Sequence, residues 1–353
     1  RLANLKDATP ADIEAGRQAM QEARLAILET EALCDLITAQ PISDDDRVKD
    51  FAFENWEEEK TGIHASRELG QARKDLQGLH AFHFPIQFPE VFLGKNPGFN
   101  VILGNPPWEK VKVEEQVFWG RHFPGVRSLK QPDFEAFREE VYENRPDLLD
   151  IMNSEINVAE RERRLVVSEK YPGMGTGDPD LYKAFCWRFW HLLQQDNSHC
   201  GVVLPRGVMS AKGSKEFRVL CFGAAKKTEV TILVNKGQWV FEVHPQYSIA
   251  LMTLSRGKPE TRNLWLKGPC SSYQEFSKSM SSSKAAKFNW QHVEDWTEDA
   301  SLPLLPGPKA LDVFMALRKH PKLSSENQEA WTAIPMNELH STAQKGLMEM
   351  NTK

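Results

Sequence analysis

Several features that would narrow the class of protein are scarce or missing in this chain of 353 residues. Its five cysteines, Cys34, Cys186, Cys200, Cys221 and Cys270, form no Cys-x-x-Cys pair, which argues against a zinc ribbon or a disulfide framework. No apolar run approaches the ~20 residues of a transmembrane helix, and no basic, apolar and small-residue leader stands at the start. We therefore expect a cytoplasmic protein with reduced core cysteines, no metal site and no membrane partner.

An excess of positive charge is also missing, because the formal net charge is −5. Contacts from Lys and Arg to phosphates supply most of the non-specific affinity of a protein for nucleic acid. If the chain meets DNA, its basic surface is therefore local, or the main DNA-gripping part lies outside this chain. Hydrophobic residues make up 41% and charged residues 26%, as in an ordinary globular protein.

The chain divides into three regions by pattern. Residues 1–80 are rich in Ala, Glu, Leu and Arg and predict a helical arm whose long first helix spans 12–38 after Thr9-Pro10. Residues 81–257 alternate buried strands with helices and predict an α/β core. Residues 258–353 carry weaker signals and predict an extension, with a Ser- and Lys-rich loop over 271–283 and a proline-rich linker over 303–308.

Within the core, five further elements are predicted after the stretch 99–108. Asp178 is the expected N-cap of a helix with Pro179 in its first turn. The later segments are a buried strand over 200–204, a helix over 215–225, and two strands over 229–234 and 247–254.

The stretch 99–108, Phe-Asn-Val-Ile-Leu-Gly-Asn-Pro-Pro-Trp, organises the rest. Its apolar run predicts a buried parallel strand that ends at Gly104 and opens into a loop stiffened by Pro106 and Pro107. Ligands of open α/β sheets bind beyond the carboxyl ends of strands, so we expect a site here. A plain turn after a strand is the alternative, since Asn and Pro are common in turns.

These residue types suit chemistry on an exocyclic amine. The side-chain carbonyl of Asn105 and the backbone carbonyl of Pro106 are two acceptors that could hold the two N–H donors of an adenine amino group. Trp108 offers a flat face on which an extruded base could stack. No general base or covalent nucleophile is required.

The tetrapeptide Asn105-Pro106-Pro107-Trp108 resembles motif IV of the amino-methyltransferases that act on DNA adenine. Residues 82–92 and the pair Gly98-Phe99 are similar to the approach to this motif in large gamma-class adenine methyltransferases, which include type IIG restriction–modification enzymes and relatives in BREX- and DISARM-like phage defence. Protein-glutamine methyltransferases carry the same tetrapeptide.

This resemblance covers roughly 170 residues and implies the second half of a Rossmann-like methyltransferase sheet. The helical arm precedes it, and the linker or extension over 258–353 leads toward a target-recognition region. It implies S-adenosylmethionine as cofactor, double-stranded DNA as partner and a place at the bacterial nucleoid. Asn105, Pro106, Pro107 and Trp108 would be catalytic. The resemblance also implies that Phe241, from a late hairpin, covers the second face of the base. An aromatic residue tucked under a hairpin is the alternative for Phe241.

The glycine-rich motif I of that family and its ribose-binding acidic residue are missing from residues 1–98, so no cofactor-binding residue can be assigned. The chain also opens at Arg1 without Met. We expect an internal fragment or one half of a split enzyme, inactive alone and completed by an upstream polypeptide or segment. The alternative is a non-catalytic DNA-contacting or assembly subunit that keeps the fold without the donor site.

Three other patterns suggest sites that their contexts oppose. The glycines at 173, 175 and 177 follow Tyr171-Pro172 and come after the catalytic loop, whereas a cofactor loop follows a strand early in a βαβ unit. Pro269-Cys270 mimics a cytosine methyltransferase nucleophile but has no predicted strand before it. Glu58-Glu59-Lys60 could be half of a nuclease signature, and a solvated helix face explains it better.

Overall fold

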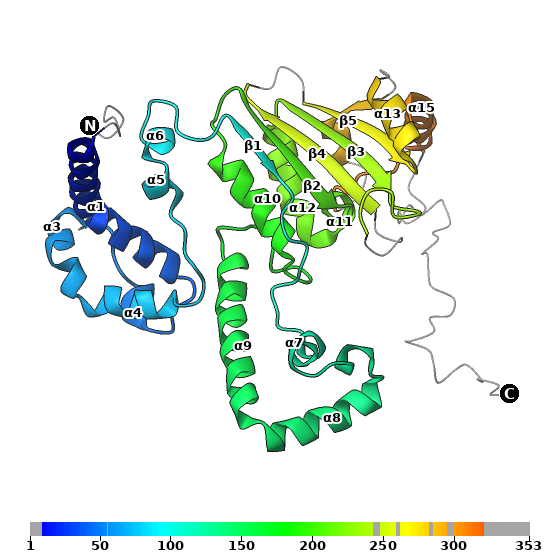
Figure 1. Cartoon of the computed structure of the whole chain (residues 1–353). Helices are drawn as coiled ribbons and strands as arrows, with labels where there is room; N and C mark the ends of the chain where they lie inside the picture. Colours follow the sequence, from blue (N-terminus) through cyan, green and yellow to red (C-terminus); the bar gives the residue numbers. More distant parts are fainter. Residues whose placement is uncertain are drawn as a thin grey trace, which may run out of the picture.

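The computed structural model describes residues 9–54, 56–242, 248–258, 262–281, 285–294 and 299–320. Within these ranges the chain runs from an N-terminal helical arm through a mixed six-stranded sheet to a helix beside the far edge of that sheet (Figure 1). Residues 243–247, which follow Phe241 and Glu242, and the tail from residue 321 lie outside the described residues.

The predicted long first helix is confirmed as α1 (Pro10–Ala39). Its N-cap is Thr9, whose hydroxyl accepts a hydrogen bond from the Asp12 N–H, and Pro10 occupies the first turn, where its missing N–H costs nothing. The remaining arm helices are short: α2 (Asp46–Lys49), α3 (Trp56–Glu59), a 3₁₀ segment (Lys60–Ala65) and α4 (Arg67–Asp75). They pack on the C-terminal part of α1 around buried Leu36.

Two single-turn helices, α5 (Phe84–Gln87) and α6 (Pro89–Phe92), connect the arm to the sheet. Their phenylalanines surround Phe99: its ring centroid lies 5.5 Å from that of Phe88 and 5.3 Å from that of Phe92. This aromatic cluster fixes the direction in which the chain enters the first strand.

The sheet has the strand order β1-β2-β4-β3-β5-β6. The strands are β1 (Val101–Gly104), β2 (Ser198–Pro205), β3 (Lys227–Val234), β4 (Ser248–Arg256), β5 (Asn263–Cys270) and β6 (Ala286–Asn289). Strands β1, β2, β3 and β5 run in one direction, whereas β4 and β6 are antiparallel to their neighbours. The predicted strands over 200–204, 229–234 and 247–254 are therefore confirmed.

β1 is parallel to β2, as predicted, but the expectation that it is buried was wrong. It pairs with β2 alone among the described residues, and its Val101 and Leu103 side chains are 57% and 80% exposed. An apolar strand is buried only where neighbouring elements cover both of its faces. In the described part of the chain, nothing covers the face of β1 that carries Val101 and Leu103.

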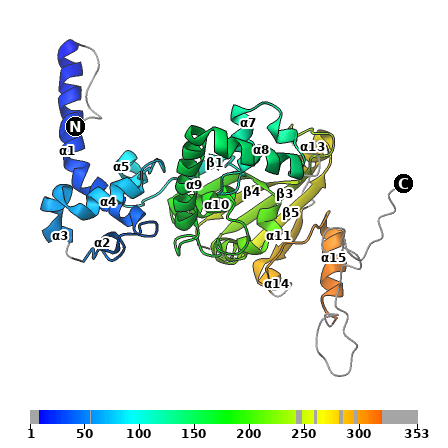
Figure 2. The same cartoon turned by 90° about the horizontal axis from the view of Figure 1, so that it is seen from below.

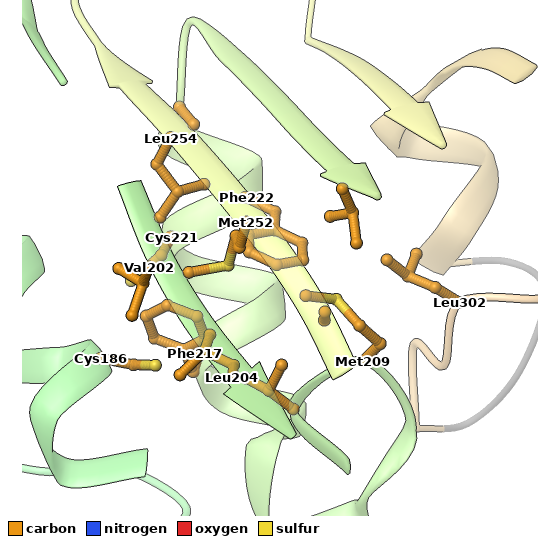
Figure 3. Packing of buried hydrophobic residues seen from close by; sticks show 14 of the residues in the cluster. Cys186, Val202, Leu204, Met209, Phe217, Cys221, Phe222, Met252, Leu254 and Leu302 are labelled. Carbon is orange, nitrogen blue, oxygen red and sulfur yellow. The ribbon is translucent and has the colours of Figure 1, made fainter. Parts of the chain in front are cut away.

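One face of the sheet carries the main core. Alternate residues such as Val202, Leu204, Met252 and Leu254 point toward α10 (Leu181–Leu192) and the helices that follow β2, where Phe217 and Phe222 meet them (Figure 3). Those helices are α11 (Gly207–Ser210), a 3₁₀ turn (Lys212–Ser214), α12 (Lys215–Phe217) and a π-helical turn (Arg218–Phe222). The helix predicted over 215–225 is thus present, with a π turn in it.

The expected start of α10 was wrong. The helix begins at Leu181 with Asp180 in the N-cap position, and Asp178 instead pairs with Lys110. Pro179 O accepts from Val111 N–H at 3.1 Å and Leu181 N–H donates to Glu109 O at 2.9 Å. The chain before α10 is therefore held by the loop after Trp108, which a local capping pattern cannot indicate.

Residues between β1 and α10 form a helical insertion beyond the carboxyl end of β1 (Figures 1 and 2). It consists of α7 (Glu115–His122), a 3₁₀ turn (Val126–Ser128), α8 (Gln131–Asn144) and α9 (Pro146–Val166). Its own core centres on Phe118 and Trp119, which are 1% and 0% exposed.

Residues beyond 257 contribute more order than the sequence indicates. They supply β5 and β6 to the same sheet, and the segment predicted as a loop over 271–283 contains helix α13 (Tyr273–Ser281), so that prediction was wrong. Helices α14 (Trp290–Glu294) and α15 (Pro308–Leu317) follow. The proline-rich stretch before α15 has no regular structure, but its Leu302 and Leu305 are buried against the core.

No helix in the described ranges is both long and apolar enough to cross a lipid bilayer.

Candidate functional site: a hollow at the carboxyl edge of the sheet

The loop Asn105–Trp108 begins where β1 ends, at the edge to which β2, β3 and β5 also point their carboxyl ends. The loop after β3 reaches the same edge and carries Phe241. The register of the strands therefore brings together two segments more than 120 residues apart in sequence, as expected for a site at the carboxyl ends of parallel strands.

These two loops line an open hollow of about 420 Å³, formed by Asn105, Pro106, Pro107, Trp108, Phe241 and Glu242. All five site residues predicted from the sequence thus border one cavity. Asn105 is exposed and its side chain makes no hydrogen bond to another described residue, whereas Pro106 is buried. The hollow therefore presents a free amide beside aromatic walls.

Trp108 and Phe241 meet at the floor of this hollow. Their ring centroids lie 6.2 Å apart and their planes are nearly perpendicular, at 89°. Both rings also pack on the buried residues Leu233, Ile249 and Cys270. Phe241 is therefore both a hairpin core residue and a wall of the hollow, so the two alternatives for it are not exclusive. Its ring meets Trp108 edge to face, and the two rings do not form parallel plates.

The indole Nε1 of Trp108 is buried and has no hydrogen-bond partner among the described residues. A buried donor without an acceptor costs roughly 1–3 kcal/mol. Trp119 in the core of the insertion has the same unpaired buried Nε1, so this donor alone does not mark a ligand site.

A buried ion pair supports the loop from the side of α10. Lys183 Nζ lies 2.8 Å from an Asp180 carboxylate oxygen and donates to Asp178 O at 2.9 Å, and its side chain is 7% exposed. Because the segment 178–181 is hydrogen-bonded to residues 109–111, this pair fixes the chain immediately after Trp108.

Asn235 is a site residue that the sequence reasoning missed. It directly follows β3 and is completely buried, and its side-chain amide is hydrogen-bonded to the backbone of Val240 and Phe241. The sequence Asn-Lys-Gly at the end of a predicted strand indicates a turn. Turn composition alone does not show which groups the side-chain amide of Asn235 bonds.

The glycine cluster at 173, 175 and 177 follows a helix, which agrees with the prediction that it is not a cofactor loop. Residues 171–177 form turns after α9, with Gly173 and Gly177 at φ values of +81° and +75°, so the element directly before them is a helix and not a strand. Glu58 is exposed at the end of α3, and Lys60 pairs with Glu57. No group of three His, Cys, Asp or Glu side chains in the described ranges could hold a metal ion.

Cys270 ends β5, so the expectation that no strand precedes it was wrong. Its thiol is buried, and burial together with the charge of Glu275 raises its pKa, which a hydrogen bond with Ser279 only partly opposes. A thiol with a raised pKa is a poor nucleophile at neutral pH, since the thiolate is the reactive form.

We therefore expect Cys270→Ala to lower the free energy of unfolding by about 1 kcal/mol, because the smaller side chain packs less well on Leu233 and Ile249. Denaturant unfolding measures this change. An unchanged free energy of unfolding would show that the buried thiol adds nothing to the packing of this cluster.

Comparison with known proteins gives little further information. No family model matches the chain, and no curated protein matches it. A crystal structure of the methyltransferase subunit of a type I restriction–modification system from Streptococcus thermophilus is similar at 14% sequence identity and a TM-score of 0.27, over 39% of this chain and 32% of that one. The chain thus spans about a third of that structure, and at this TM-score the likeness carries no argument about fold or function.

Proposed function

We propose that this chain is part of a DNA adenine amino-methyltransferase of a restriction–modification or phage-defence system, using S-adenosylmethionine. The observation that carries the proposal is the convergence of Asn105, Pro106, Trp108 and Phe241 on one hollow at the carboxyl edge of the sheet. The element order β1, α10, β2, α12, β3, β4 supports it, because it is the order of the second half of the methyltransferase sheet that the sequence resembles.

The chemistry of the amino group explains these residue types. The adenine nitrogen is a poor nucleophile because its lone pair is conjugated into the ring, and the base must leave the duplex to be reached. Two acceptors, the side-chain carbonyl of Asn105 and the backbone carbonyl of Pro106, would hold the two N–H groups and draw the nitrogen toward tetrahedral geometry. In this scheme the adenine nitrogen is itself the nucleophile, so no residue of the hollow has to form a covalent bond.

The described residues do not fit the whole cofactor. S-adenosylmethionine needs a glycine-rich turn that follows a strand and opens a helix, with a ribose-binding carboxylate nearby. In the described ranges β1 is the first strand of the sheet, and the glycines at 173, 175 and 177 follow α9. We therefore propose that an upstream polypeptide or segment supplies the cofactor-binding half, and we derive no step through the cofactor from this chain.

The free side of β1 is where that half would pair. The sheet face opposite the main core is apolar near this edge, where the exposed Leu103 lies beside Gly201. The same face is charged at the far strands, where Lys227 and Lys287 lie over the Trp265 ring. An unpaired strand next to an apolar surface is a template for another strand and the element that follows it.

Methyl transfer by the completed enzyme tests the function. Duplex DNA is incubated with S-adenosylmethionine, and N6-methyladenine is measured in the digested product by mass spectrometry, with a glutamine-containing peptide as the competing substrate. Methylated adenine supports the proposal, whereas methylated glutamine would show that the substrate is a protein and not DNA. DNA binding without methyl transfer favours the alternative, which is a non-catalytic assembly or DNA-contacting subunit.

The role of Trp108 is tested with a duplex that carries 2-aminopurine at the target position. Trp108→Phe keeps a π face and should retain most of the fluorescence increase that reports base extrusion. Trp108→Ala should weaken capture of the base by roughly 1–3 kcal/mol, the value of one base–aromatic stack.

Trp265→Ala is the matched control, because this tryptophan lies half-buried in β5 and does not line the hollow. It should leave the 2-aminopurine signal unchanged. Equal signals for Trp108→Phe and Trp108→Ala would remove Trp108 from the base site.

A further inference from the structure

The loop that carries Phe241 is closed by a single buried side chain. Asn235 is 0% exposed. Its Oδ1 accepts from the backbone N–H of Val240 at 3.1 Å and of Phe241 at 3.3 Å, and its Nδ2 donates to the Phe241 carbonyl at 2.9 Å. One amide therefore satisfies both backbone polar groups of Phe241.

The rest of the loop is fixed independently. Gly237 and Gln238 have φ values of +77° and +56°, and the Gln238 N–H donates to Asn235 O at 2.9 Å, which closes a tight turn. Trp239 Nε1 donates to Val234 O at 2.9 Å. These bonds fold the loop back onto the end of β3. Phe241 is the last residue of the loop that is hydrogen-bonded in this way.

The geometry of this clamp decides where the Phe241 ring lies. Asn235 does not line the hollow, whereas Phe241 does and meets Trp108 edge to face at 6.2 Å. Of the small polar residues, only Asn offers an acceptor for two N–H groups and a donor for a carbonyl at this length. Asp would keep the acceptors but set a carboxylate oxygen against the Phe241 carbonyl.

We propose that Asn235 is a positioning residue that holds Phe241 in the wall of the base-binding hollow. The part of this inference that concerns base capture rests on the proposed function. The part that concerns the loop does not, because it follows from the hydrogen bonds of Asn235 alone. The two parts are tested by different measurements.

The loop is tested in the full chain by hydrogen exchange and by ¹⁹F NMR of 4-fluorophenylalanine at position 241. Asn235→Ala should raise the exchange rates of the Val240 and Phe241 amides at least tenfold and should shift or broaden the position-241 resonance. Asn289→Ala is the matched control: this amide also accepts a backbone N–H, that of Gln291 at 3.1 Å, but at the end of β6. An unchanged resonance and unchanged exchange in Asn235→Ala would overturn the clamp.

Base capture is tested by a double-mutant cycle on the completed enzyme with the 2-aminopurine duplex. Asn235→Ala and Phe241→Ala should each weaken capture by roughly tenfold, the value of an aromatic contact, and the double variant should be no weaker than Phe241→Ala. Asn235→Asp should weaken capture as much as Asn235→Ala, because aspartate lacks the N–H donor that bonds the Phe241 carbonyl.

A loss in Asn235→Ala that persists in the Phe241→Ala background would show that Asn235 acts by another route and would overturn the proposal. Full capture by Asn235→Ala would overturn it as well. If the wild-type enzyme extrudes no base, the proposed function fails and with it the base-capture part, whereas the exchange and ¹⁹F results still decide whether Asn235 holds Phe241.

Discussion

Asn105→Ala should reduce the turnover of the completed enzyme by a factor on the order of 10²–10³ while leaving its affinity for duplex DNA nearly unchanged. The side-chain carbonyl is one of two acceptors proposed to hold the amino group, and removal of one preorganised hydrogen-bond partner of a transition state typically costs this much. Asn105 is exposed and makes no side-chain hydrogen bond within the described residues, so its loss should not unfold the protein.

Single-turnover methyl transfer measures this effect, with DNA affinity followed separately by fluorescence anisotropy. Asn100→Ala is the matched control: Asn100 precedes the same strand and bonds to Gln194 at the opposite end. It should retain wild-type turnover. Turnover by Asn105→Ala within a few-fold of wild type would show that Asn105 does not hold the reacting group.

The second large effect concerns the cofactor. The chain alone should bind S-adenosylmethionine at least 100-fold more weakly than the same chain completed by the proposed upstream half, and it should not methylate DNA. In the proposed function the residues that line the hollow contact only the methyl end of the cofactor. Among the described residues, no glycine-rich turn follows a strand and opens a helix to hold its adenosine and its charged amino-acid end. Calorimetric titration before and after addition of the upstream half is the measurement.

A variant at the free edge of β1 sharpens this test. Leu103→Lys places a charge where the proposed upstream half would pack and should prevent its binding, yet it should not destabilise the chain, because Leu103 is 80% exposed. Val313→Lys on α15, 61% exposed, is the control for the same kind of change on another surface. Tight cofactor binding by the chain alone would reveal a donor site within it, with the glycines at 173, 175 and 177 the first to examine.

Local patterns predicted the elements whose signals are themselves local. The apolar runs of β2, β3 and β4 and the Thr9-Pro10 start of α1 each report a preference of a few adjacent residues for one backbone conformation. The same applies to the strand that ends at Gly104 and to the stiff loop after it. The sequence also predicted that glycines 173–177 follow no strand.

Other features depend on partners that are distant in sequence, and local patterns misread them. The burial of β1 was overestimated because an apolar strand shows its preference for cover but not whether cover is present. Asp178 looked like a helix cap because Asp-Pro is a local start signal, yet Lys110, 68 residues away, binds it. β5 was missed because its parallel pairing with β3, which places it in the sheet, leaves no local mark.

By itself, then, the sequence predicted which residues could carry chemistry and determined which backbone conformation many segments prefer, because propensity, turn residues and hydrophobic period act over a few positions. Only the tertiary structure decided that Asn105, Trp108 and Phe241 share one hollow, that the amide of Asn235 is buried and bonded to Phe241, and that the outer edge of β1 is unpaired among the described residues. The shared hollow and the free edge arise from strand register, which joins residues more than 100 positions apart, and the burial of Asn235 arises from packing over the whole fold.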